Sequence, residues 1–204
     1  FITGKVNTSS PQWNPDGTQI AFLMKRGINA KKQVWVIPFD GGEARQLTKS
    51  KSDVSQFRWC PKGNKIGYVA VTPKSEKEKQ LAEKGFGFIY FEENLTHRNL
   101  YLLDIEIEKT EQPTSDKTVW DFQFSPDGTH IVAAMSPKNL VDHSYMFKNL
   151  FTINTSTKEQ KKILDKEGKL GNFAYSPNGK QIVFTAALEL KDHQISQVYT
   201  LNLA

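Results

Sequence analysis

A pair of adjacent carboxylates, Glu92-Glu93, is the feature of this sequence best suited to bind a charged ligand. Two neighbouring carboxylates suit an ammonium group, because their oxygens accept charge-assisted hydrogen bonds from it. Arg98 adds a guanidinium at the base of the same loop. We therefore name Glu92, Glu93 and Arg98 as candidate substrate-binding residues; the alternative is a solvated loop mouth.

The histidines give weaker grounds for a metal site. There are four of them: His97, His130, His143 and His193. Two stand in the pairs Asp142-His143 and Asp192-His193, which occupy near-equivalent loops of the repeats described below. No close ligand spacing such as His-x-x-x-His accompanies them. We predict no metal and no cofactor, and we expect ordinary polar loop residues here.

Nothing in the sequence predicts a catalytic nucleophile. The Gly-x-Ser-x-Gly nucleophile elbow of the α/β-hydrolases is absent from every position. The single cysteine, Cys60, stands in a turn position that Ser125 and Ser176 take elsewhere, so a small structural residue is favoured over a reactive thiol. We predict no catalytic residue in this chain.

The elements that would position these residues repeat four times. Each copy has an aromatic strand, a Pro-x-Gly turn, and an isoleucine five residues after the proline. The prolines are Pro15, Pro61, Pro126 and Pro177, spaced by 46, 65 and 51 residues, and the isoleucines are Ile20, Ile66, Ile131 and Ile182. Pro fixes φ and Gly takes the positive φ that a chain reversal needs. The apolar alternation that follows each turn is typical of a half-buried strand.

The first three repeats each contain four predicted strands, and the fourth contains three. A single sheet of this kind needs copies of itself on either side to bury its two faces. Four-stranded repeats of this length are typical of a β-propeller. The predicted fold class is therefore all-β, a β-propeller of four-stranded antiparallel blades at about 9–48, 52–114, 117–164 and 169–204.

Two predictions concern the ends and the loops of this propeller. Residues 1–3 align with the tail of a fourth strand, and the last repeat stops after its third strand. Residues 1–3 could complete the last repeat and so close a ring of four blades. Three residues make a poor closing strand, however, so we expect a piece of a larger propeller. The longest loop, Thr72 to Arg98, is expected to hold a short helix between Pro73 and Gly85 and no helix is expected elsewhere.

The runs NPDGTQIAF (Asn14 to Phe22) and VWVIPFDGGEARQLT (Val34 to Thr48) resemble the propeller repeat of the prolyl oligopeptidase family, particularly its acylaminoacyl peptidase and dipeptidyl aminopeptidase-like branch. A similar repeat occurs in the TolB propeller. The resemblance covers essentially the whole chain. It implies a non-catalytic propeller portion of a serine peptidase, which gates and binds peptide for a separate C-terminal α/β-hydrolase domain.

The same resemblance bears on the acidic pair. Dipeptidyl peptidases of this family hold the free amino terminus of a substrate with paired propeller glutamates. The resemblance implies the same role for Glu92 and Glu93. The family pair precedes a first strand of a blade, whereas this pair precedes a third strand. The alternative function is a stand-alone interaction propeller of the TolB kind.

The composition and charge of the chain limit the classes of partner that we expect it to bind. The chain is 38% hydrophobic and 24% charged, as in a soluble globular protein, and has no apolar run that could span a bilayer. The net charge of +5 would suit nucleic acid, but the densest lysine run, Lys74 to Lys84, alternates in sign. We expect no nucleic-acid and no membrane partner, leave a homo-oligomer open, and expect a cytoplasmic location, or a periplasmic one if the protein is TolB-like.

Overall fold

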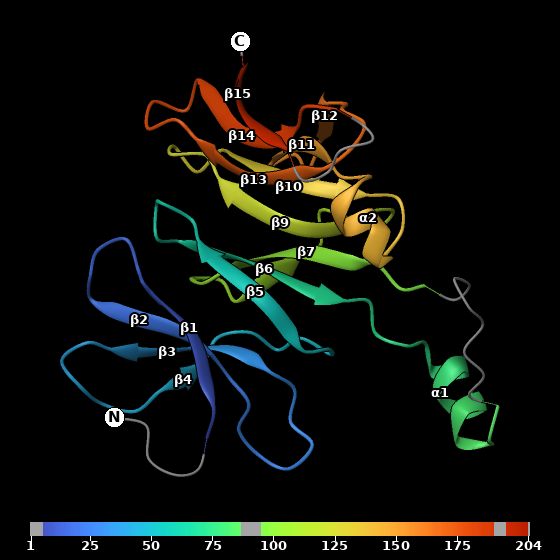
Figure 1. The fold of residues 1–204 in the computed structure, drawn as a ribbon. Helices are drawn as coiled ribbons and strands as arrows, with labels where there is room; N and C mark the ends of the chain where they lie inside the picture. The colour runs from blue at the N-terminus through green and yellow to red at the C-terminus, as the bar shows by residue number, and fades with distance from the viewer. Residues whose placement is uncertain (1–5, 87–94, 190–194, 204) are drawn as a thin grey trace.

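The computed structural model describes residues 6–86, 95–189 and 195–203. The described chain forms antiparallel sheets that follow one another along an arc (Figure 1). Three sheets have four strands and the last has three, and in each the strands neighbour one another in chain order. The predicted all-β, propeller-like fold with about four blades is confirmed.

We call the sheets blades 1 to 4. Blade 1 holds β1 (Thr8–Trp13), β2 (Gln19–Met24), β3 (Gln33–Pro38) and β4 (Arg45–Gln46). Blade 2 holds β5 (Val54–Trp59), β6 (Lys65–Val71), β7 (Arg98–Asp104) and β8 (Lys109–Glu111). Blade 3 holds β9 (Thr118–Phe124), β10 (His130–Ser136), β11 (Asn149–Asn154) and β12 (Gln160–Leu164). Blade 4 holds β13 (Leu170–Tyr175), β14 (Gln181–Ala187) and β15 (Ser196–Asn202).

The core lies between the blades rather than within one sheet. An aliphatic face of each blade packs against an aromatic face of the next: Ala21, Leu23 and Val34 of blade 1 meet Phe57, Ile66 and Tyr68 of blade 2. Equivalent clusters join blade 2 to blade 3 and blade 3 to blade 4. Since each buried aromatic or branched side chain is worth about 1.5 to 3 kcal/mol, these interfaces supply most of the stabilisation.

A set of equivalent glutamines connects the first strands of successive blades. Gln12 donates through Nε2 to the Phe57 carbonyl at 2.9 Å, and Gln56 donates to the Trp120 carbonyl at 3.0 Å. Gln123 completes the set by donating to Phe173 at 2.8 Å. These bonds fix how each blade is placed beside the next.

The loops that lead from the second to the third strand of blades 2 and 3 each carry a helix. α1 (Glu76–Glu83) begins at Ser75, which forms a capping box with Glu78, and it buries no residue. The predicted helix between Pro73 and Gly85 is thus confirmed, and Figure 1 shows it standing apart from the sheets.

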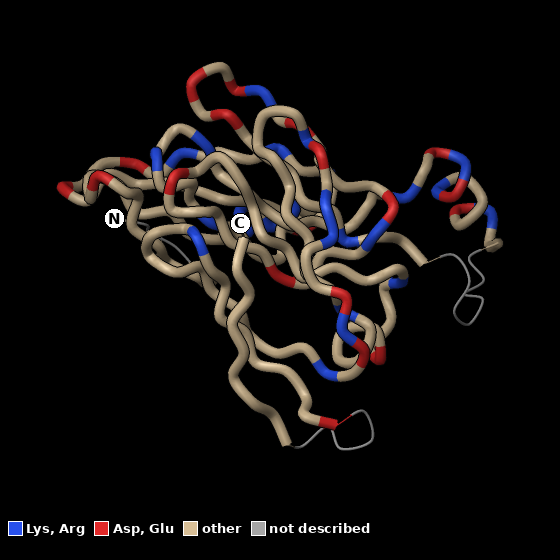
Figure 2. The backbone as a smooth tube through the Cα atoms, turned by 90° about the horizontal axis from the view of Figure 1, so that it is seen from above, with Lys and Arg blue, Asp and Glu red and all other residues tan. Residues whose placement is uncertain are grey.

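The prediction of no helix elsewhere was wrong. α2 (Val141–Tyr145) is a single turn with no buried residue. It is too short to produce a helical apolar period, so the sequence pattern gave no signal for it. No helix in the described part of the chain is long and apolar enough to cross a membrane. Lys and Arg are interspersed with Asp and Glu along the loops (Figure 2).

Candidate functional site

Arg98 is the one candidate substrate-binding residue that falls within the described ranges; Glu92 and Glu93 lie outside them. Arg98 begins β7, at the end of the blades where second strands lead into third strands. We call this end the loop rim. Arg98 stands there between blade 2 and blade 3, where the longest loop returns to the sheets.

The guanidinium of Arg98 is held by two contacts. Its Cζ lies 5.4 Å from the ring centroid of Trp120, a cation–π contact, and its Nη2 donates to Ser55 Oγ at 3.2 Å. The Nε atom is buried and makes no hydrogen bond. Burial lowers the pKa of Arg98 from its ordinary value, but an arginine remains charged at neutral pH.

No carboxylate of the described residues pairs with Arg98. A guanidinium has five N–H donors in a planar fork that matches a carboxylate or phosphate. One donor of Arg98 goes to a neutral hydroxyl, and another is buried without an acceptor. Because the buried Nε is closed to a ligand, the guanidinium offers an anionic group its charge and its terminal Nη donors.

The surroundings of Arg98 are fixed from blade 3. Trp120 donates through Nε1 to Ser136 Oγ at 2.7 Å, and this hydroxyl donates to the Lys138 carbonyl at 2.9 Å. Just before Arg98, His97 Nδ1 lies 3.0 Å from Thr118 Oγ1. The indole and the returning loop are thereby anchored, so the Arg98 side chain rests on a preorganised support.

Other charged side chains gather around Asp121, the neighbour of Trp120 on β9: Arg58 of blade 2 and Lys148, which stands just before β11. Asp121 accepts from Arg58 Nη2 at 3.0 Å, and Arg58 Nε donates to the Phe122 carbonyl at 2.5 Å. Lys148 is partly buried, and this burial lowers its pKa; the charge of Asp121 opposes the change, and that of Lys169 adds to it. This edge of blade 3 therefore presents cations around one carboxylate that already has a partner.

The metal-ligand types do not converge. In residues 6–86, 95–189 and 195–203, no three or more His, Cys, Asp and Glu side chains lie close enough to hold a metal. His143 packs on the Phe147 ring at 4.8 Å, and the predicted companion pair Asp192-His193 lies outside the described residues. Cys60 is a buried free thiol.

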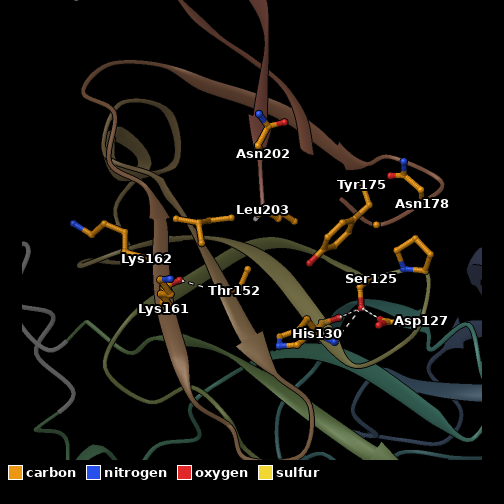
Figure 3. Close-up of a pocket in the computed structure, with 13 residues that line it drawn as sticks. Ser125, Asp127, His130, Thr152, Lys161, Lys162, Tyr175, Asn178, Asn202 and Leu203 are labelled. Atoms are coloured by element: carbon orange, nitrogen blue, oxygen red, sulfur yellow. Dashed lines mark hydrogen bonds between the residues drawn. The ribbon is translucent and has the colours of Figure 1, made fainter. Parts of the chain in front are cut away.

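A groove of about 510 Å³ lies at the opposite end of the blades, between blades 3 and 4 (Figure 3). We call it the turn groove. It is lined by Ser125, Asp127 and His130, the three residue types of a catalytic triad, together with Lys161 and Tyr175. These three residues lie within six positions of the sequence, and their geometry decides whether they could act together.

The trio is not arranged as a catalytic triad. Ser125 Oγ donates to Asp127 at 2.5 Å, and it accepts from the backbone N–H of His130 rather than from the ring. The imidazole instead contacts Thr129 Oγ1 at 2.9 Å through Nδ1, and its Nε2 lies 3.4 Å from Asn154 Nδ2. A triad needs the imidazole between the hydroxyl and the carboxylate, so no general base faces this serine.

The same bonds close the corresponding turn of blade 4, which shows that they are structural. There Ser176 Oγ accepts from the Gln181 N–H at 2.9 Å and pairs with Asn178 at 2.7 Å. In blade 3 the hydrogen bonds from Ser125 and Thr129 lower the pKa of Asp127 to about 2. The Ser-Pro-Asp-Gly run is therefore a turn signal, as the repeat pattern predicted.

Comparison with known sequences finds relatives over unequal parts of the chain, and no family model matches it. The uncharacterized peptidase YuxL of Bacillus subtilis is 27% identical over 190 residues, which are 93% of this chain and 23% of that protein. The uncharacterized protein YidR of Escherichia coli is 54% identical over 57 residues, 28% of this chain and 14% of that protein. The chain thus spans less than a quarter of either relative.

Comparison with solved structures finds the same fold in proteins of different activity. An acylaminoacyl peptidase of Pyrococcus horikoshii matches with a TM-score of 0.67 at 17% identity, over 95% of this chain and 30% of that one. TolB of Acinetobacter baumannii matches with a TM-score of 0.64 at 14% identity, over 99% of this chain and 42% of that one. An oligogalacturonate lyase of Vibrio parahaemolyticus matches with a TM-score of 0.62 at 17% identity, over 97% of this chain and 49% of that one.

At these identities the structural matches establish the fold alone, since one fold hosts many functions. The resemblance expected from the repeats is nonetheless found in both kinds of comparison. This chain is a propeller-fold protein whose structural neighbours include acylaminoacyl peptidase and TolB propellers, and whose sequence resembles a Bacillus peptidase over most of its length.

Proposed function

We propose that this chain is the non-catalytic propeller portion of a serine peptidase of the prolyl oligopeptidase family. In this role it binds and selects peptides for a separate α/β-hydrolase domain. The observation that carries the proposal is the 27% identity to a peptidase over 93% of this chain. The match to under a third of an acylaminoacyl peptidase supports it, because the remainder of that enzyme leaves room for a hydrolase domain.

Arg98 is the group through which such a propeller would bind peptide. Its positive charge and its aromatic support suit a carboxylate, either the carboxy terminus or an acidic side chain. Glu92 and Glu93 stay in the proposal as the groups that would bind an amino terminus. The loop rim would then be the side that faces the incoming peptide, since binding functions concentrate on variable loops of a rigid scaffold.

The test compares two forms of one short peptide, with a free and with an amidated carboxy terminus, by isothermal titration calorimetry. Arg98→Gln should weaken binding of the free form about ten- to a hundredfold, the effect of losing a charge-assisted hydrogen bond. Binding of the amidated form should not change. Arg26→Gln is the matched control, because Arg26 also lies over an indole, that of Trp35 at 5.9 Å, but in blade 1.

Two results would contradict the proposal. If both peptide forms bind equally, or if Arg26→Gln has the same effect as Arg98→Gln, then Arg98 is no carboxylate receptor. If no peptide binds, the TolB-like interaction propeller becomes the better account, and the match to TolB over 99% of this chain favours it as the second candidate. A reading frame that continues past Ala204 into a Gly-x-Ser-x-Gly motif would favour the peptidase.

A further inference from the structure

Lys148 of blade 3 occupies the position that Arg98 has in blade 2. Arg98 stands two residues before Leu100, and Lys148 stands two residues before Leu150; both leucines are fully buried in the third strands of their blades. Both cations therefore lie at the loop rim. Blades 2 and 3 each have another blade of the described chain on either side (Figure 1), so the surroundings of these two residues do not depend on where the chain begins or ends.

Trp120 connects the two positions. The Arg98 guanidinium lies over its ring, and its Nε1 donates to Ser136 Oγ at 2.7 Å. Ser136 is the last residue of β10, and this strand pairs with β11, which Lys148 directly precedes. The two cations are therefore neighbours on the loop rim, one beside the ring of the indole and the other beside the strand end that accepts its N–H.

The backbone fixes this arrangement. The register of β9 against β10 shifts between Val119 and Asp121, so Trp120 is the extra residue of a β-bulge. A bulge directs a side chain away from the regular alternation of a strand. The loops that lead to the two cations are also bonded to each other, because Asn139 Nδ2 donates to the Thr96 carbonyl at 2.8 Å.

The Lys148 ammonium has neither a hydrogen bond nor an ion pair with any residue that the structure describes. It is partly buried, and this burial lowers its pKa. The charge of Asp121 opposes that change, but the Asp121 carboxylate already accepts from Arg58 at 3.0 Å. An ammonium has three N–H donors, and burying a charge without a partner is costly. An anionic group at this position would therefore be stabilised.

Blade 1 has the same position but a different charge environment. There Lys32 precedes the third strand, and its backbone N–H donates to the Asp53 carboxylate of the next blade at 2.7 Å. The position of Asp53, directly before a buried residue of the first strand, holds Thr118 in blade 3 and Lys169 in blade 4. A carboxylate thus accompanies the cation of blade 1, whereas a hydroxyl and an ammonium take its position for the cations of blades 2 and 3.

We propose that Lys148 is a specificity-determining residue of the peptide site, and that it acts with Arg98 to select peptides with an acidic side chain near a free carboxy terminus. Arg98 binds the terminal carboxylate, and the Lys148 ammonium donates to the carboxylate of the side chain. A neutral amide in place of that side chain leaves the lysine charge without a counterion. This inference rests on the proposed function, because it requires that peptide binds at the loop rim.

The test uses three pairs of short peptides, all with an acetylated amino terminus and a free carboxy terminus. The peptides of a pair have glutamate or glutamine at the last, the second-last or the third-last position. In isothermal titration calorimetry, at least one glutamate peptide should bind about ten- to a hundredfold more tightly than its glutamine partner, the effect of one charge-assisted hydrogen bond.

Two variants assign this preference to its residue. Lys148→Gln should remove the preference for glutamate, yet it should keep the preference for a free over an amidated carboxy terminus, which reports on Arg98. Lys32→Gln is the matched control, because it removes the cation at the same position of blade 1, and it should keep both preferences. Thermal unfolding followed by circular dichroism checks that both variants are folded.

Three outcomes would overturn the proposal. The first is equal binding of glutamate and glutamine in all three pairs, and the second is a glutamate preference that survives in Lys148→Gln. The third is an equal loss of this preference in Lys32→Gln, which would show a general effect of net charge. If the free carboxy terminus is still preferred in these cases, the role of Lys148 fails while the proposed function holds; if that preference is also absent, both fail.

Discussion

Thr48, which follows β4, bonds to the third strand of blade 1 through its hydroxyl: it accepts the Val34 N–H at 2.9 Å and donates to Gln33 Oε1 at 2.7 Å. Thr48→Val keeps the shape of the side chain but removes its hydroxyl. The Val34 N–H then loses its acceptor inside a core where Val34 is fully buried, and Gln33 loses one of its donors. A buried polar group without a partner costs about 1 to 3 kcal/mol, so we expect the free energy of unfolding to fall by about that amount.

Two measurements check this loss. Urea unfolding gives the change in global stability, which for a chain of this size corresponds to about 2 to 4 °C in Tm per kcal/mol. Native-state hydrogen exchange of the Val34 amide gives the local change, because this N–H would no longer be bonded. Thr114→Val should cost less than Thr48→Val, because the bond from Thr114 to Asn99 is 3.4 Å and that from Thr48 to Gln33 is 2.7 Å.

The matched control is Thr200→Val on β15, an exposed threonine for which we expect a change within about 0.5 kcal/mol. The reasoning would be refuted if Thr48→Val destabilised the chain no more than this control. It would also be refuted if exchange of the Val34 amide were unchanged, because the hydroxyl would then not be the acceptor that protects it.

Three further predictions follow from the blade interfaces and the turns. Gly67→Ala should lower stability by about 1 to 3 kcal/mol in urea unfolding, because its Cβ would lie 2.6 Å from the Phe122 ring; a neutral result would mean that the ring moves freely. The depressed pKa of Asp127, about 2, is a stabilising contribution present above its unfolded value near 3.8 and lost as pH falls toward 2. Asp127→Asn, the residue type that blade 4 has at Asn178, should therefore flatten the fall of Tm between about pH 4 and pH 2, and an unchanged profile would contradict the assignment. A fluorophosphonate probe should leave Ser125 unlabelled, since no imidazole activates its hydroxyl; stoichiometric labelling detected by mass spectrometry would overturn the structural account of this turn.

The sequence determined the repeating unit and its local structure. Pro-x-Gly turns and period-two apolar strands are short-range signals, because a turn needs a particular φ at one glycine and a strand alternates its side chains at every residue. Each occurs four times in register, so the strands, the first-hairpin turns and the propeller-like architecture were predictable. The α1 helix was predictable for the same reason, since Pro73 and Gly85 mark its limits locally.

The candidate site around Arg98 depends on which residues of blades 2 and 3 contact each other. No local pattern in the sequence predicts contacts between blades. Arg98 and Trp120 come together only because blades 2 and 3 pack face to face. The loop position of Arg98 made it a candidate from sequence, but neither its indole support nor its buried, unpaired Nε was predictable.

Residue types alone can also suggest a site that the structure does not form. Ser125, Asp127 and His130 have the types of a triad within six residues, yet the turn directs the serine to the backbone and the imidazole away from it. Similarly, Gln33 and Thr48 are fifteen residues apart and bond only because β3 and β4 lie side by side. Sequence specified the strands through local backbone preferences, whereas the tertiary packing of blades decided which polar groups found partners and which, like the Nε of Arg98, did not.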